Sequence, residues 1–124
     1  MRRSRHRGRT DANQTAIVSA LREIGCSVLP ISEIGDGAPD LVAWRHVVGY
    51  ALLEVKDGSK QPAERRLSDD EVAFHKAWRG PIFVVDSVDD AIRVMTGQRA
   101  HRGALEGATP PPRRASGTTT EEQQ

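Results

Sequence analysis

The stretch "PDLVAWRHVVGYALLEVKDG", residues 39–58, places three ionisable side chains at the ends of two apolar runs. Asp40 begins the first run, whereas Glu54 and Lys56 close the second. Side chains alternate between the two faces of a strand, so Glu54 and Lys56 are expected on the same face. If the runs pair as a hairpin, Asp40 approaches Glu54, and two converging carboxylates repel each other. We therefore expect a third group to compensate their charge, because burying unpaired charges costs folding free energy.

A divalent cation is one such group. Mg²⁺ accepts a few hard oxygen ligands, keeps several waters and also binds phosphate oxygens. A lysine beside it can orient or deprotonate the water that attacks a phosphodiester and can neutralise charge on the phosphoryl oxygens. The chain has three lysines against fifteen arginines, which favours a specific need for a compact ammonium at Lys56. The alternative interpretation is a structural ion pair at a sheet edge.

The sequence around these residues predicts the elements that position them. Apolar residues at three- and four-residue spacing indicate an amphipathic helix over residues 12–24. A short strand over residues 26–31 contains Pro30, which favours an edge position. Residues 40–44 and 49–56 are strand-like runs joined by a short turn, and they predict a hairpin.

The second half of the compact region continues the alternation of elements. Ser68 followed by Glu71 forms a capping-box pattern and predicts the start of a second helix. Residues 81–85, "PIFVV", indicate a strand covered on both faces, and Ser87 begins a last helix. The predicted fold class is α/β with the order α-β-β-β-α-β-α, in which helices flank a mixed sheet.

Charge and composition divide the chain into three parts. Residues 1–9 contain five arginines and no acid, which predicts a basic flexible arm suited to phosphate backbones or, alternatively, a solvated start with no partner. Residues 10–97 contain nine Lys or Arg against fourteen Asp or Glu and form the expected folded domain. Residues 98–124 are rich in Gly, Pro, Thr and polar residues, which predicts a disordered tail.

Other features exclude several classes of protein. No apolar run approaches the length of a membrane span, and no apolar segment near the start resembles a signal peptide. Cys26 is the one cysteine, so it is expected as a small buried hydrophobe in a reducing, cytoplasmic setting. The histidines lack zinc-ligand spacing. Trp44 and Trp78 are expected in the core rather than on a surface for base stacking.

The motif at residues 39–56 resembles a known family. "PD" at 39–40, thirteen intervening residues and "EVK" at 54–56 are similar to the PD-(D/E)XK nuclease signature. The segment "GDGAPDLVA" resembles the glycine-rich segment that leads into this motif in Holliday-junction resolvases and in the VRR-NUC group, especially its small phage-type members. The resemblance extends from Asp11 to Met95. It implies a restriction-endonuclease-like core, Mg²⁺- or Mn²⁺-dependent hydrolysis of DNA and, by analogy with resolvases, a homodimer.

The resemblance also implies roles for individual residues. Asp40 and Glu54 would be metal ligands, with the Val55 carbonyl as a further one, and Lys56 would be the catalytic lysine. Many relatives carry a glutamate on the first helix, where this chain has Gln14. Gln14 could bind through its amide oxygen or through a metal water, and Asp11 is the second candidate.

Relatives also place a polar residue on the helix after the lysine, for which Glu71 is the candidate here. Its alternative role is the capping box alone. Basic residues of the arm and of the loop after Lys56 are expected to contact DNA: Arg2, Arg3, Arg5, Arg7, Arg9, Lys60, Arg65 and Arg66.

The expected function is that of a metal-dependent, structure-selective DNA endonuclease, resolvase-like or flap-cutting, in the cytoplasm of a bacterial or phage-infected cell. Branched or flapped DNA would be its partner. Two alternatives remain open at the level of sequence. One is a non-catalytic nucleic-acid-binding module, and the other is an accessory protein-interaction domain of a phage replication or packaging machine.

Overall fold

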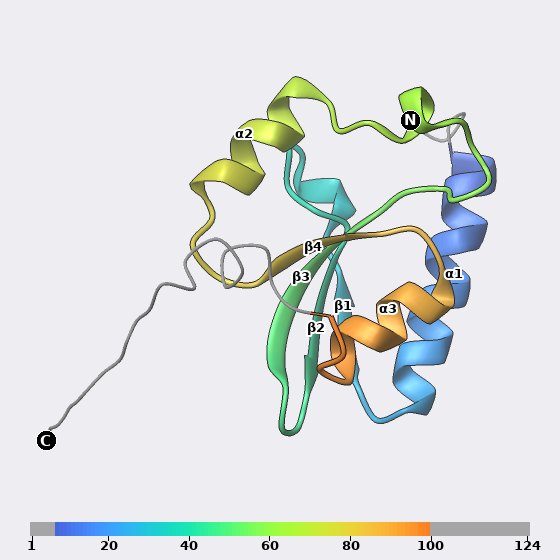
Figure 1. The fold of residues 1–124 in the computed structure, drawn as a ribbon, viewed down its shortest axis with the longest axis vertical. Helices are drawn as coiled ribbons and strands as arrows, with labels where there is room; N and C mark the ends of the chain where they lie inside the picture. Colours follow the sequence, from blue (N-terminus) through green and yellow to red (C-terminus); the bar gives the residue numbers. More distant parts are fainter. Residues whose placement is uncertain (1–6, 100–124) are drawn as a thin grey trace, which may run out of the picture.

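The computed structural model describes residues 7–99 of the 124-residue chain, and side chains from Ala12 to Arg99. The observed order α-β-β-β-α-β-α confirms the predicted α/β fold class (Figure 1). Two short 3-10 helices, Ser32–Ile34 and Pro62–Arg65, lie in loops where no element was expected. The main elements are α1 (Arg7–Glu23), β1 (Ser27–Pro30), β2 (Leu41–Arg45), β3 (Gly49–Val55), α2 (Asp69–Ala77), β4 (Ile82–Val85) and α3 (Val88–Met95).

The four strands form one mixed sheet in the order β1-β2-β3-β4. β1, β2 and β3 are antiparallel neighbours, and β4 pairs with β3 in parallel. A parallel neighbour requires a crossover connection, and α2 lies within it. Pro30 ends the edge strand β1, as its missing N–H predicts. Val47 and Gly49, at φ of 86° and 87°, turn the chain between β2 and β3.

The hydrophobic core lies between the sheet and the helices α1 and α3, which pack against each other on one face. Alternate strand residues such as Leu41, Leu53 and Val85 point into it and are fully buried. Cys26 is buried there too, as expected, and burial raises the pKa of its thiol. Within residues 7–99, no helix has the length and apolar character needed to cross a bilayer.

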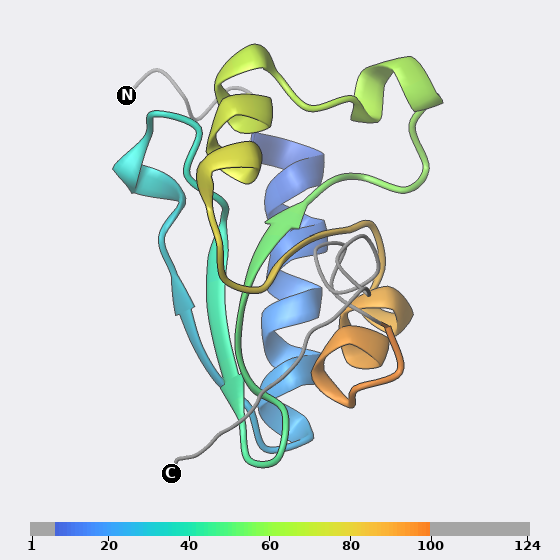
Figure 2. The same cartoon turned by 60° about the vertical axis from the view of Figure 1, so that its left-hand side comes forward.

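α2 lies on the opposite side of the sheet from α1 and α3 (Figure 1). After β3 the chain leaves the sheet, passes through the second 3-10 helix and returns to α2 (Figure 2). The predicted capping box is confirmed: the Glu71 amide donates to Ser68 Oγ at 3.2 Å, and the Ser68 amide donates to Glu71 Oε1 at 2.9 Å. Ser87 caps α3 by accepting a hydrogen bond from the Asp90 amide at 3.0 Å.

The start of α2 is fitted against the loop that precedes Asp40. Gly37 has a φ of 82°, and a Cβ at this position would overlap the backbone carbonyl of Asp70. Only a glycine satisfies both the backbone conformation and the close approach. The first turn of α2 is thereby held beside the strand end that carries Asp40.

Two sequence-based expectations are corrected here. Trp44 and Trp78 are not core residues, because 48% and 39% of their surface is exposed. Trp44 lies on the sheet face away from α1 and α3, opposite Tyr50 in the hairpin register. Trp78 follows the last turn of α2 and stacks on Phe74, with ring centroids 5.4 Å apart. Nine-residue α2 leaves part of this face uncovered.

The N-terminal boundary of the first helix also differs from the expectation. α1 begins at Arg7, inside the stretch expected as an arm, because arginine is a good helix former and no proline interrupts the run. Residues 1–6 and 100–124, which hold most of the predicted arm and tail, lie outside the described part of the chain.

We expect Gly37→Ala to destabilise the fold more than Gly35→Ala. Both positions have a positive φ, so each alanine costs about 1–2 kcal/mol of backbone strain. At Gly35 an added Cβ meets nothing within 4 Å, whereas at Gly37 it meets α2 and adds an overpacking cost of roughly 1–3 kcal/mol. Urea denaturation measures both free energies of unfolding, and equal losses would contradict the close approach.

Candidate functional site

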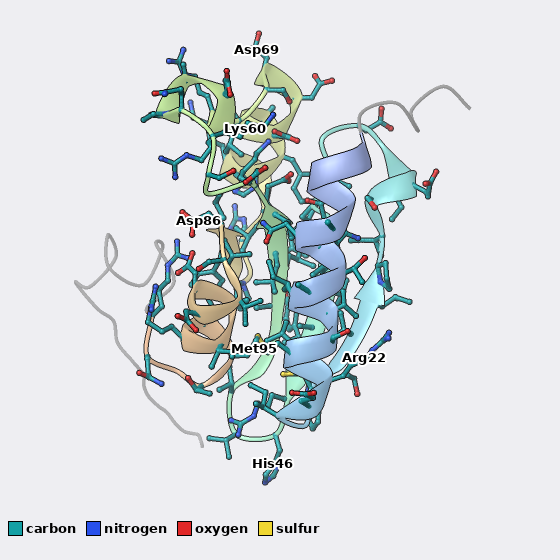
Figure 3. All side chains as sticks on the ribbon, turned by 90° about the vertical axis from the view of Figure 1, so that its right-hand side faces the viewer. Arg22, His46, Lys60, Asp69, Asp86 and Met95 are labelled. Atoms are coloured by element: carbon teal, nitrogen blue, oxygen red, sulfur yellow. The ribbon has the colours of Figure 1, made fainter. Side chains whose placement is uncertain are left out.

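A cavity of about 230 Å³ opens where β3 ends, between the sheet and the start of α2. Lys60 lies at the same end of the molecule as Asp69 at the start of α2, while His46, in the β2–β3 turn, lies at the opposite end (Figure 3). The residues that line the cavity are Asp40, Glu54, Val55, Lys56, Asp57, Lys60, Glu64 and Glu71.

The hairpin brings Asp40 and Glu54 together, as their spacing predicts. Asp40 immediately precedes β2, and its amide donates to the Leu53 carbonyl at 3.0 Å. Its Oδ2 accepts a hydrogen bond of 2.8 Å from the Val55 amide, so the carboxylate is fixed against β3. Glu54 lies within β3 on the face opposite Leu53 and Val55, and only 3% of its surface is exposed.

The electrostatics of this pair are unfavourable for two negative charges. Burial and, after it, the charge of Asp40 raise the pKa of Glu54 to about 9. Burial also raises the pKa of Asp40, against the lowering effect of the Val55 amide. Glu54 Oε1 is buried and has no hydrogen-bond partner among the described residues. Without a cation, the folded chain therefore favours a proton on this pair at neutral pH.

Lys56 and Glu71 also line the cavity. Lys56 Nζ donates to Glu71 Oε1 at 3.0 Å and lies 4.0 Å from Glu54 Oε2. Burial would raise the pKa of Glu71, but the hydrogen bonds from the Ser68 backbone and from Lys56 lower it overall. One carboxylate oxygen thus completes the cap of α2 and contacts the lysine. The two roles that the sequence left as alternatives for Glu71 are geometrically compatible.

The first helix contributes a hydrogen bond that the sequence did not predict. Asn13 Nδ2 donates to the Lys56 carbonyl at 2.8 Å and ties α1 to the chain just after β3. Gln14 is half-buried and is not among the residues that line the cavity, and the side chain of Asp11 is not described. The signal for Asn13 was its place beside Gln14 at the same end of the helix.

Two further acids line the cavity and were also missed. Asp57 follows the "EVK" motif directly, and its Oδ1 accepts hydrogen bonds from the amide and hydroxyl of Ser59 at 2.9 and 2.6 Å. Glu64 comes from the second 3-10 helix, whose position the sequence did not predict. Acids therefore outnumber lysines in the lining of the cavity.

The donor set can be tested against a divalent cation. Among the described residues, no three His, Cys, Asp or Glu side chains are arranged as a ready metal cage. Mg²⁺ does not need such a cage, because one or two carboxylates suffice when waters complete its coordination. Asp40 and Glu54 supply hard oxygen ligands, and a positive charge between them would relieve their mutual repulsion. Val55 lines the same cavity. The residues fit a small hard cation.

The basic residues expected at DNA have different surroundings. Lys60 lines the cavity, Arg66 is exposed, and Arg65 Nη1 lies 3.3 Å from Asp86 Oδ2. Arg7 and Arg9 lie in the first turns of α1, although their side chains are not described. Arg2, Arg3 and Arg5 lie outside the described residues.

Comparison with solved structures gives a fold match. A chain described as "VRR_NUC domain" superimposes with a TM-score of 0.55 at 22% sequence identity, covering 71% of this chain and 95% of that one. No protein-family model and no curated protein matches the chain. The protein therefore has the fold of the chain described as "VRR_NUC domain", and this confirms the sequence-based expectation at the level of the fold.

We expect Glu54→Gln to stabilise the protein in EDTA. With a pKa of about 9 in place of the ordinary 4.5, folded Glu54 keeps a proton that the unfolded chain has released. The free energy of unfolding therefore falls as pH rises between these values. At pH 8, which lies between the two pKa values, the substitution should raise it by several kcal/mol and flatten the fall.

The measurement is urea denaturation in EDTA between pH 5 and 9. Glu23→Gln, at the exposed end of α1, is the matched control and should leave the profile unchanged. A Glu54→Gln profile parallel to that of the wild type would mean that the pKa of Glu54 is not raised in the folded protein.

Proposed function

We propose that the protein is a metal-dependent nuclease that hydrolyses phosphodiester bonds of DNA. The observation that carries this proposal is the convergence of Asp40, Glu54 and Lys56 on one cavity at the end of β3. The fold shared with a VRR_NUC domain supports it, because a site of this composition at this place in the sheet is what the PD-(D/E)XK motif implies.

Asp40 and Glu54, with the Val55 carbonyl, would hold Mg²⁺ or Mn²⁺. When bound, such an ion polarises a phosphoryl oxygen and stabilises the charge that develops on it. The Asp40 carboxylate is pre-oriented for this role by the Val55 amide, which engages Oδ2 at 2.8 Å and leaves Oδ1 for other partners. Gln14 and Asp11 remain candidates for a further contribution through water.

Lys56 would act on the substrate side of the cavity. Its ammonium can orient the attacking water and neutralise charge on the phosphoryl oxygens. The 3.0 Å hydrogen bond to Glu71 restricts the amine to the cavity wall, and the hydrogen bond between Asn13 and the Lys56 carbonyl fixes the backbone that carries it. Both interactions reduce the freedom that the lysine would otherwise lose on binding substrate.

The acidic lining bears on how DNA would bind. Asp40, Glu54, Asp57, Glu64 and Glu71 repel a phosphate backbone more than Lys56 and Lys60 attract it. Affinity must therefore come largely from outside the cavity, for which the arginine arm, Arg65 and Arg66 are the candidates. A folded unit of this size has little surface for reading base sequence, which favours selection of branched or flapped DNA by shape.

We expect cleavage in Mg²⁺ or Mn²⁺ and none in EDTA. Asp40→Asn and Lys56→Ala should each lower the rate at least about 100-fold, since the first removes a proposed metal ligand and the second removes the group proposed to act on the reacting phosphate. The assay compares branched, flapped, single-stranded and linear duplex DNA. Asp36→Asn and Lys76→Ala, both exposed, are the matched controls. Cleavage indifferent to the Asp40 and Lys56 substitutions would overturn the site, and binding without cleavage would favour a non-catalytic module.

Replacing Arg2, Arg3 and Arg5 by alanine should weaken DNA binding in low salt without changing the cleavage of bound DNA. For each arginine that pairs with a phosphate, its removal should reduce the slope of log affinity against log salt concentration by about 0.9 on duplex DNA. Fluorescence anisotropy across a salt series measures this slope. Arg93→Ala on α3 is the control, and an unchanged slope in the triple variant would remove the arm from the interface.

The resemblance also leads us to propose a homodimer, in which two sites could cut two strands. Sedimentation of the full chain, with and without branched DNA, tests this proposal.

A further inference from the structure

His75 and Glu54 are the two polar side chains buried in the described part of the fold, with 7% and 3% of their surface exposed. They face each other, since His75 Nε2 lies 3.9 Å from Glu54 Oε1. We infer that His75 is a positioning residue for Glu54: it donates a hydrogen bond to Oε1 and so orients the carboxylate when a cation binds to it. The inference rests on the proposed function of the cavity and assigns to it a residue that the motif does not contain.

The two oxygens of Glu54 face different surroundings. Oε2 lies 4.0 Å from Nζ of Lys56, which lines the cavity together with Glu54. Oε1 lies 3.9 Å from His75 Nε2, is buried, and receives no hydrogen bond among the described residues. An oxygen in this position needs a donor once the carboxylate is charged. With its proton on Nε2, His75 becomes that donor when the 3.9 Å gap closes to the ordinary hydrogen-bond length of about 3 Å.

α2 carries His75 to this place together with Glu71. The two residues are four apart and therefore lie on the same face of the helix. Glu71 contacts Lys56 at 3.0 Å, while His75 approaches Glu54, so one helix face reaches two residues of the motif. The capping box at Ser68 and the close approach of Gly37 to Asp70 fix the helix that presents them.

A donor behind a ligating carboxylate orients the ligand without touching the ion. Loss of such a partner typically lowers metal affinity about 10- to 100-fold. An alternative role for His75, filling space between α2 and the sheet, would affect stability and leave the affinity of the folded protein for metal unchanged. Metal affinity therefore separates the two roles.

The test measures Mn²⁺ binding to the full chain by electron paramagnetic resonance. His75→Leu keeps much of the bulk and removes the donor, and it should weaken binding about 10- to 100-fold. His75→Gln keeps a nitrogen donor near the position of Nε2 and should bind within a few fold of wild type. His46→Leu, in the exposed β2–β3 turn, is the matched control.

Cleavage provides a second readout. The rate of His75→Leu should recover at saturating Mn²⁺, because the residue acts on metal binding rather than on the reacting phosphate. A third readout needs no variant: the ¹⁵N resonance of His75 Nε2 should shift when Mg²⁺ is added to the wild type.

Unchanged Mn²⁺ affinity in His75→Leu, equal losses in His75→Leu and His75→Gln, or a resonance that ignores Mg²⁺ would each overturn the inference. Absence of Mn²⁺ binding by the wild type would overturn it as well. If Mn²⁺ binds, depends on His75 as stated, and no DNA substrate is cut, then the nuclease proposal fails and the positioning role stands.

Discussion

The burial of Glu54 beside Asp40 is the constraint around which the rest of the site is arranged. Glu54 lies in an interior strand of the sheet with 3% of its surface exposed, and this burial raises the free energy of a second negative charge beside Asp40. A fold selected for stability alone would place an apolar residue at this position. The surrounding groups instead leave one buried carboxylate oxygen without a hydrogen bond and put a lysine 4.0 Å from the other. An added cation would therefore stabilise the charged form of this arrangement.

The scaffold holds these groups from three directions. The hairpin fixes Asp40 through the Val55 amide, and α1 fixes the Lys56 backbone through Asn13. α2 closes the remaining side and is itself fixed by its capping box and by the approach of Gly37. Glu71 takes part in both the helix cap and the cavity, because its Oε1 accepts hydrogen bonds from the Ser68 amide and from Lys56 Nζ. A substitution that disrupts the capping box would therefore also disturb the contact between Glu71 and Lys56 in the cavity.

α2 leaves part of one sheet face uncovered, and exposed aromatic side chains lie there. Trp44 and Tyr50 are cross-strand neighbours on that face, and Trp78 follows the end of α2. Their partial exposure contradicts the usual expectation that tryptophans with apolar neighbours are buried. Strand periodicity identifies the two faces, but it does not tell how far a helix extends over one of them.

The sequence by itself determined the order of the elements, the hairpin, the helix caps and the grouping of Asp40, Glu54 and Lys56, because these depend on periodicity and short-range spacing. Tertiary structure alone decided that Asn13 reaches Lys56, that Glu64 lines the cavity, and that His75 faces Glu54. Those interactions join side chains that are distant along the chain, and they depend on how α1 and α2 pack against the sheet. Local sequence patterns do not specify the exact position of a helix on a sheet. For α2, that position depends on contacts formed only in the folded chain, such as the close approach of Gly37 to the Asp70 backbone.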